Sequence, residues 1–198
     1  MADYSTRNST NVTLLFLPGN HSLNGQLSFT NLDSFLMLKY NAQTVTVACT
    51  SQSGSFEISR TTTVSVKGLQ IIGCGGTVIE LVNQFALENT IFQGLGNVGT
   101  ALELNRTNEA CIVSCFFING SGHFYSQATF GGAIVSFHSS ILVKDTIFER
   151  NNAEFGAAIY AQESNISTNN SKFTYNRAFY EGGVLDVDSC TVHIAVTV

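Results

Sequence analysis

The stretch that decides the fold runs Phe148-Glu149-Arg150-Asn151 and continues five residues later as Gly156-Ala157-Ala158-Ile159. It recurs twice with the same order of an aromatic residue, an asparagine, a small-residue pivot and an apolar pair. The other two copies are Phe116-x-x-Asn119 with Gly131-Gly132-Ala133-Ile134, and Phe173-x-x-Asn176 with Gly182-Gly183-Val184-Leu185. The step from Phe148 to Phe173 is 25 residues, which predicts stacked structural units and not one irregular core.

Short apolar bursts of period two, separated by Gly, Asn and Ser, surround these copies and predict two or three strands per unit. No segment has the sustained apolar spacing of a long helix. The sequence therefore predicts an all-β, right-handed, single-stranded parallel β-helix (a solenoid) of roughly eight coils. We expect residues 1–198 to form one array that is a fragment of a longer chain, with a loop inserted at about residues 120–130.

The repeated residues have physical roles in such a coil. Adjacent coils lie ~4.8 Å apart, so equivalent side chains stack on one another. The three repeated phenylalanines should then form an inward aromatic stack, and the three repeated asparagines an amide ladder that binds the backbone of the turns. The small pivots allow positive φ and a close approach of neighbouring backbones.

The strand register of the earlier coils stays open. Phe92-x-x-Leu95 is a degenerate copy of the repeat and fixes no alignment. Leu102 and Leu104 favour one strand parity, whereas two other pairs of apolar residues favour the opposite one. Those two pairs are Val135 with Phe137, and Leu185 with Val187.

Charged residues are scarce, at 12% of the chain against 44% hydrophobic residues. Nine basic and fourteen acidic side chains give a net charge of −5 without a basic cluster, which argues against nucleic acid as a partner. The longest apolar run, Leu14-Leu15-Phe16-Leu17, is far shorter than the ~20 residues that span a bilayer. We therefore expect no transmembrane segment in this chain.

Seven Asn-x-Ser/Thr sequons favour a glycoprotein of the extracellular space or the cell surface. No signal peptide is visible, because residues 1–13 lack an apolar core region. The alternative is a β-protein rich in Asn and Ser that carries sequons without using them. We expect Asn119 to lie in the amide ladder and to carry no glycan. The remaining candidates for glycosylation are Asn8, Asn11, Asn20, Asn105, Asn165 and Asn169.

The five cysteines do not form a recognisable metal or redox motif. Cys49 and Cys74 are 25 residues apart, so they can lie on adjacent coils as a disulfide or as two buried thiols. Cys111-x-x-x-Cys115 lacks the spacing of a zinc or redox site, and structural roles are expected for both residues.

Asp186 and Asp188 are the candidate catalytic pair, because residues i and i+2 lie on one face of a strand. A glycosidase needs two carboxylates close together, and a lyase needs a base that abstracts a proton. Lys144, Lys172 and Arg177 fall in neighbouring coils by the 25-residue count. The alternative is an outward acidic pair that keeps the strand face soluble. The four histidines are scattered without metal-ligand spacing, and we expect no metal and no cofactor.

Phe-x-x-Asn followed by Gly-Gly-Ala-Ile resembles the repeat of polymorphic outer membrane proteins, which share the right-handed β-helix of the pectin-lyase-like superfamily. This likeness covers about residues 116–187, and Ala157-Ala158 departs from the Gly-Gly of the repeat. The N-terminal half, with Phe16–Leu23 and Gly68–Gly76, is similar to large animal proteins of the right-handed β-helix type. The resemblance implies adhesion and surface display.

These observations predict a non-catalytic extracellular or cell-surface scaffold for adhesion, with glycans or cell-surface proteins as partners. An uncapped coil end should also self-associate. One alternative is a carbohydrate-active enzyme, a polysaccharide lyase or glycoside hydrolase, which would have Lys or Arg opposite Asp186 and Asp188. The second alternative is a passive spacer.

Overall fold

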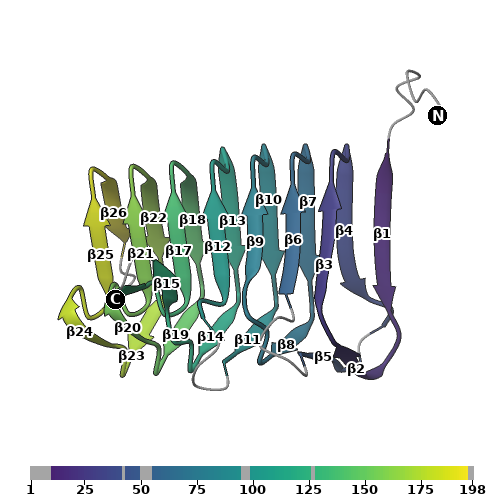
Figure 1. Ribbon diagram of the computed structural model, residues 1–198, viewed down its shortest axis with the longest axis horizontal. Helices are drawn as coiled ribbons and strands as arrows, with labels where there is room; N and C mark the ends of the chain where they lie inside the picture. The colour runs from purple at the N-terminus through teal and green to yellow at the C-terminus, as the bar shows by residue number, and fades with distance from the viewer. Residues whose placement is uncertain (1–9, 42, 50–54, 95–98, 126–127, 196–198) are drawn as a thin grey trace.

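In the computed structural model the chain forms a parallel β-solenoid of about seven turns (Figure 1). The structure describes residues 10–41, 43–49, 55–94, 99–125 and 128–195. Within these ranges all regular structure is β-strand and there is no helix. The predicted all-β parallel coil is confirmed, and the expected number of coils is close to the observed one.

Three parallel sheets form the walls, and successive strands of the chain pass from one sheet to the next. Sheet A contains β1 (Asn11–Phe16), β4 (Ser34–Lys39), β7 (Thr63–Lys67), β10 (Gln84–Glu88), β13 (Glu109–Val113), β18 (Ser140–Lys144), β22 (Asn165–Asn169) and β26 (Thr191–Ala195). Sheet B contains β2 (Gly19–Leu23), β5 (Val45–Cys49), β8 (Gln70–Ile72), β11 (Ile91–Gln93), β14 (Phe116–Ile118), β19 (Ile147–Glu149) and β23 (Lys172–Thr174). Sheet C contains β3 (Gln26–Thr30), β6 (Ser55–Ser59), β9 (Thr77–Glu80), β12 (Leu102–Asn105), β17 (Ile134–Phe137), β21 (Ile159–Gln162) and β25 (Leu185–Asp188).

The core lies between the three sheets, where equivalent residues of successive coils face inward. In sheet A, Phe85 aligns with Val64 of the preceding coil and Ala110 of the following coil, and all three are buried. The period-two alternation of the sequence places apolar residues in these inner rows and polar residues outside. Burying one large apolar side chain in this way contributes about 1.5–3 kcal/mol.

A stack of phenylalanine rings runs along the inner side of sheet B. The centroids of Phe92, Phe117, Phe148 and Phe173 follow one another at 5.3, 5.1 and 4.8 Å with nearly parallel rings. Phe117 aligns with Phe148 and is fully buried, whereas Phe116 is exposed. The alignment of the repeat through Phe116 is therefore wrong by one residue. Two consecutive phenylalanines satisfy the sequence pattern, but only one of them can face the core from a strand.

In sheet C, the same alternate positions of each strand face the core from β12 to β25. Leu102 aligns with Ile134, and Ile134 and Ile159 continue this inner row to Leu185. Leu185 and Val187 thus share the inner parity of Leu102, and the expectation that they take the opposite parity is wrong. Their exposed position on the last coil leaves them less buried than the leucines of earlier coils.

The coil turns at corners where one residue takes the left-handed backbone conformation. Among the residues that the structure describes, fourteen other than glycine have φ between 48° and 58°. Each such residue is disfavoured by about 1–2 kcal/mol. At most of these corners the next residue has a polar side chain that points inward and binds backbone at the turn, whereas Leu32, Val82 and Gly120 stand at the other three corners. For example, the Thr90 hydroxyl donates a 2.9 Å hydrogen bond to the Glu88 carbonyl, which helps to offset the strain.

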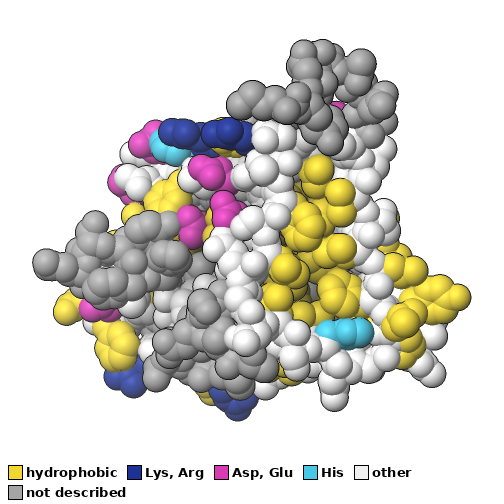
Figure 2. Space-filling view, turned by 45° about the vertical axis from the view of Figure 1, so that its right-hand side comes forward, with side chains coloured by type: hydrophobic (Ala, Val, Ile, Leu, Met, Phe, Trp, Pro, Cys, Tyr) yellow, Lys and Arg dark blue, Asp and Glu magenta, His cyan; other side chains and the backbone are white. Residues whose placement is uncertain are grey.

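The apolar residues of the first coil are less buried than those of the later coils. Val12, Leu14 and Phe16 point inward from β1 but are only partly buried, and Leu17 and Leu27 are exposed. Figure 2 shows hydrophobic side chains gathered on the side where this end of the molecule comes forward. The apolar interior therefore reaches the surface at this end.

Candidate binding surface

A fourth sheet extends sideways from the last coils, and we call it the lateral sheet (Figure 1). It contains β15 (His123–Tyr125), β16 (Ala128–Phe130), β20 (Asn152–Phe155) and β24 (Arg177–Glu181). β15 and β16 are antiparallel, whereas β16, β20 and β24 are parallel and belong to successive coils. The segment that the sequence predicts as a loop at about residues 120–130 therefore contains a strand pair, because β16 pairs with the equivalent strand of the next coil.

Aromatic rings form a row along the lateral sheet. The ring of Phe130 stacks on Phe155 at 5.2 Å, and Phe155 lies 5.5 Å from Tyr180 on the next coil. Phe130 also lies 4.6 Å from Tyr160, which stands on the outer face of sheet C. Val135, the neighbour of Tyr160 on that face, is fully buried. The aromatic row thus joins the lateral sheet to the outer face of sheet C.

The last strand of the lateral sheet contains a β-bulge. Arg177 pairs with the residue 25 positions before it, but Glu181 pairs with Phe155, which is 26 positions before it. The extra residue presents two consecutive aromatic side chains, Phe179 with 58% and Tyr180 with 70% of their surface exposed. Bulges re-aim side chains and occur often beside functional sites.

Two arginines lie against exposed aromatic rings, one within β24 and one at the corner that precedes it. The Arg177 guanidinium is 5.1 Å from the ring centre of Phe179, and that of Arg150 is 5.6 Å from the ring centre of Tyr175. Arg150 also forms a 2.6 Å ion pair with Glu149. These contacts place planar hydrogen-bond donors beside exposed aromatic faces.

Carboxylates border the aromatic row on the outer face of β25. Asp186 stands beside Tyr160, and Asp188 lies two residues further along the strand. Burial raises the pKa of the Asp186 carboxyl, and the nearby charges of Glu181 and Asp188 raise it further. Burial also raises the pKa of the Tyr160 hydroxyl, and the nearby charges of Asp186 and Asp188 raise it further. The last coil therefore carries a group of acids that repel one another beside aromatic rings.

The basic residues that the sequence places near this acidic pair are distributed over other sheets. Lys144 ends β18 of sheet A, Lys172 begins β23 of sheet B, and Arg177 begins β24 of the lateral sheet. Within the described ranges, the ion pairs of the structure include neither Asp186 nor Asp188. The pair therefore lies on one strand face, as its spacing predicts, without a basic partner in contact.

The repeat asparagines form an amide ladder, but with one member fewer than predicted. Asn151 is buried, and its Oδ1 accepts a 2.9 Å hydrogen bond from the Gly120 N–H. Its Nδ2 donates to the Phe117 carbonyl at 3.0 Å and to Oδ1 of Asn176 at 2.9 Å. Asn119 takes the left-handed position before the ladder, with φ of 57°, and Gly120 stands where a third asparagine was expected. The placement of Asn119 in the ladder is wrong by the same one-residue shift.

The glycine pivots act as the sequence predicts, through conformation and through close packing. Gly131, Gly156 and Gly182 have φ of 55°, 59° and 62°. At Gly132 a Cβ atom would lie 2.2 Å from a backbone oxygen of the next coil, so no side chain fits there. A Cβ on Gly183 would meet nothing within 4 Å, because this residue lies on the last coil.

Cys49 and Cys74 form a disulfide between adjacent coils, with 2.09 Å between the sulfur atoms and 4.8 Å between the Cα atoms. The other three cysteines are free thiols. Cys115 is buried at a corner, and burial raises its pKa to about 11, so the reactive thiolate is scarce near neutral pH. Cys111 and Cys190 are half-buried.

The sequon asparagines differ in their exposure. Those with an exposed side chain are Asn11, Asn20 and Asn165, and the half-buried ones are Asn105, Asn119 and Asn169. Asn8 lies outside the described residues. Attachment of a glycan is therefore easiest to accommodate at the three exposed positions.

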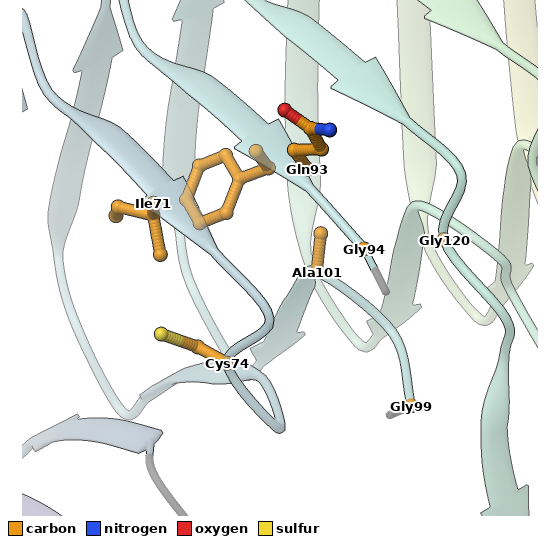
Figure 3. A pocket seen from close by; sticks show the side chains of 8 residues that line it. Ile71, Cys74, Gln93, Gly94, Gly99, Ala101 and Gly120 are labelled. Atoms are coloured by element: carbon orange, nitrogen blue, oxygen red, sulfur yellow. The ribbon is translucent and has the colours of Figure 1, made fainter. Parts of the chain in front are cut away.

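The candidate site is an open surface and not an enclosed pocket. The cavity drawn in Figure 3 lies between Cys74, Phe92 and Ala101 and has a volume of about 10 Å³, which is room for about one water molecule. Across the part of the chain that the structure describes, no three His, Cys, Asp or Glu side chains are placed to hold a metal ion. The same residues include no helix with the length and apolarity needed to cross a membrane.

Sequence reasoning missed the aromatic row, although its spacing is visible in the chain. Phe130, Phe155 and Tyr180 follow one another at 25 residues, the period of the repeat. Phe130 and Phe155 directly precede the pivots Gly131 and Gly156, but Tyr180 stands two residues before Gly182, so the bulge in β24 breaks the motif in the last copy.

Comparisons with known proteins return no match: no family model, no curated protein and no solved structure matches this chain. The role of the lateral sheet is therefore inferred from its own residues.

Proposed function

We propose that this protein is a non-catalytic β-helix scaffold of the extracellular space or cell surface, and that its lateral sheet binds carbohydrate in adhesion. The observation that carries the proposal is the aromatic row of Phe130, Phe155 and Tyr180, one ring per coil, which ends in the exposed bulge. Large exposed apolar groups gathered on one surface mark interaction sites more often than scattered ones do.

The chemistry of this surface suits sugar rings. A sugar presents C–H faces, which pack on aromatic rings, and hydroxyl edges, which need donors and acceptors. Phe179 and Tyr180 supply exposed ring faces, and Arg177 supplies planar donors beside them. The carboxylates of Glu181 and Asp186 supply acceptors next to the same strand.

The charge of the surface favours a neutral polysaccharide over an acidic one. Burial raises the pKa of Asp186, and the negative charges of Glu181 and Asp188 raise it further. An anionic polymer at the aromatic row would add further negative charge to this group and would be repelled. A solenoid with one ring per coil offers several weak contacts along a sugar chain, which together give useful affinity.

The enzymatic alternative is a polysaccharide lyase or glycoside hydrolase that uses Asp186. A raised pKa beside aromatic groups is a feature of general acids, and it favours this alternative. A lyase would also need a base near the acids, but Lys144 and Lys172 lie on sheets A and B, and the Arg177 guanidinium lies over the ring of Phe179. The passive-spacer alternative gives the exposed aromatic bulge no role.

The extracellular location is supported by the disulfide and by the exposed sequons. Disulfides persist in oxidising compartments such as the extracellular space, so the Cys49–Cys74 bridge favours this location. Asn11, Asn20 and Asn165 can carry glycans without burying them. We also propose that the coil is right-handed and that the chain is related to the pectin-lyase-like superfamily and its polymorphic outer membrane proteins. The inward phenylalanine stack and the asparagine ladder support this relationship.

Retention on immobilised polysaccharides, neutral and acidic, tests the proposal. We expect retention on at least one neutral polysaccharide, and a loss of about tenfold or more in affinity for the double variant F179A/Y180A, since each ring contributes roughly 1 kcal/mol. Tyr40→Ala is the matched control, because Tyr40 is 62% exposed and lies at the corner after β4, outside the lateral sheet. An equal loss for Tyr40→Ala, or no retention on any polysaccharide, would reject the proposal.

A further inference from the structure

We propose that a hollow at the corner between sheets A and B binds a sugar carrying a tetrahedral oxyanion, a sulfate or phosphate ester, and that the Lys39 ammonium holds this oxyanion. The hollow lies on the second to fourth coils, where β4, β7 and β10 end and the chain turns toward sheet B (Figure 1). Its volume is about 480 Å³, within the range of ~300–1,000 Å³ that is common for ligand sites. The lining residues are Leu38, Lys39, Asn41, Lys67, Gly68 and Asn89.

A glycine determines where the Lys39 side chain lies. Lys39 ends β4, and its stem lies against Gly68 of the next coil. A Cβ atom on Gly68 would stand 2.9 Å from Cε and 3.2 Å from Cδ of Lys39, so a larger residue would push the stem away. Asn89 occupies the equivalent corner position one coil further along, and both residues have positive φ, 73° for Gly68 and 48° for Asn89. The corner conformation therefore accepts asparagine, and the glycine at position 68 is what makes room for the lysine.

Lys39 is the uncompensated cation of the hollow. The Lys67 ammonium lies 2.5 Å from Oε2 of Glu88, which balances its charge. Over the described ranges, Lys39 takes part in no ion pair and its ammonium makes no hydrogen bond. The hollow therefore presents a positive charge on a chain whose net charge is −5, and this charge attracts an anion.

Two side-chain amides add hydrogen-bond donors to the hollow. Oδ1 of Asn41 accepts a 2.9 Å hydrogen bond from the Gln43 N–H, which leaves the Nδ2 group of Asn41 as a donor for a ligand. The amide of Asn89, two coils further along, has no hydrogen-bond partner among the residues that the structure describes. Donors on separate coils suit a tetrahedral oxyanion, whose oxygen atoms point in different directions. A planar carboxylate is matched better by the fork of an arginine.

The other features of the hollow favour a sugar as the carrier of the oxyanion. Leu38 offers an apolar surface to the C–H groups of a sugar ring, and the two amides can bind its hydroxyl groups. Sites for phosphopeptides use clusters of arginine, and none of the described residues that line the hollow is an arginine. β4 pairs with β1 and β7, and β7 pairs with β4 and β10, so a peptide finds no free strand edge here.

The inference does not depend on the function proposed for the lateral sheet. That sheet belongs to later coils, and none of its described residues lines the hollow. Tyr40 is also not a lining residue, so the control variant Tyr40→Ala of the polysaccharide assay leaves the lining intact. The variant F179A/Y180A should therefore bind the sugar ester as the parent does. Loss of binding in that variant would place the ester on the aromatic row and overturn the inference.

An NMR titration of the full chain with four matched sugars tests the inference. Glucose 6-sulfate, glucose 6-phosphate, glucuronate and glucose share one ring and differ only at carbon 6. We expect at least one of the two esters to bind about tenfold or more tightly than glucuronate and glucose, with shifts of the Gly68 and Asn89 amide signals, and the tighter ester identifies the oxyanion. Binding of neither ester, or equal binding of glucuronate, would overturn the inference. Tighter binding of a phosphoserine peptide than of either ester would reject the sugar as the carrier.

Three variants separate a specific contact from a general effect of charge. Lys39→Met should weaken binding of the ester about tenfold or more, because a charge-assisted hydrogen bond is lost. Lys172→Met removes the same charge from β23 of sheet B and should leave binding unchanged. Gly68→Asn copies the corner residue of the next coil, keeps the charge of Lys39 and should weaken binding by displacing the stem. Equal losses for the two lysine variants, or full affinity in Gly68→Asn, would contradict the assigned role of Lys39.

Discussion

Replacing Asn151 by alanine should lower the free energy of unfolding by about 3–5 kcal/mol. The side chain is buried and makes three hydrogen bonds, with the Gly120 N–H, the Phe117 carbonyl and Oδ1 of Asn176. A buried group that loses its partner is destabilised by about 1–3 kcal/mol. Gly120 and Phe117 are buried, so both would contribute fully, whereas the half-buried Asn176 can recover part of its loss from water.

Urea unfolding followed by circular dichroism measures this change by linear extrapolation. The control is Asn119→Ala, at a corner residue with φ of 57° that is outside the ladder. Alanine is less favourable than asparagine in that conformation, so a loss of about 1 kcal/mol is expected. A loss below about 1 kcal/mol for Asn151→Ala, or an equal loss for both variants, would refute the ladder register described above.

Three further perturbations test other parts of the structure. Phe117→Ala should destabilise the protein by about 3–5 kcal/mol, while Phe116→Ala should cost about 1 kcal/mol or less in the same unfolding assay; the reverse order would contradict the corrected register. Replacing Cys49 and Cys74 by serine should remove about 3 kcal/mol, measured by urea unfolding against the oxidised parent, and no change would show that the bridge does not form. Because the folded-state pKa of Asp186 is raised, the native state holds its proton more tightly, and stability should fall as pH rises from the unfolded value through the folded pKa. In thermal scans, the melting temperature of D186N minus that of the parent should therefore be larger at pH 7 than at pH 3. A smaller difference at pH 7 would contradict the raised pKa.

The period of the coil could be predicted from sequence because the residues that set it are chemically distinctive. The asparagine rung at Asn151 and Asn176 needs an amide, and the pivot at Gly132 needs the absence of a side chain. The bridge between Cys49 and Cys74 follows from the same count of 25 residues. In each case one residue type satisfies the geometry far better than the others, so the pattern survives in a single sequence.

Other features are tolerant of residue type, and the sequence hides them. Either phenylalanine of the pair Phe116 and Phe117 can match the repeat, and only the strand register decides between them. The left-handed corners accept residues as different as Leu81 and Tyr175, because their side chains point away from the core. The lateral sheet depends on pairing between β16 and β20 of successive coils, which is a non-local property.

The most direct test of the central claim, binding without turnover, is to recover the polysaccharide retained by the protein and assay it for chemical change. We expect the polysaccharide to be retained, with no new reducing ends and no unsaturated uronides after prolonged incubation. New ends or unsaturated products that disappear in the variants D186N or D188N would contradict it and establish the enzymatic alternative.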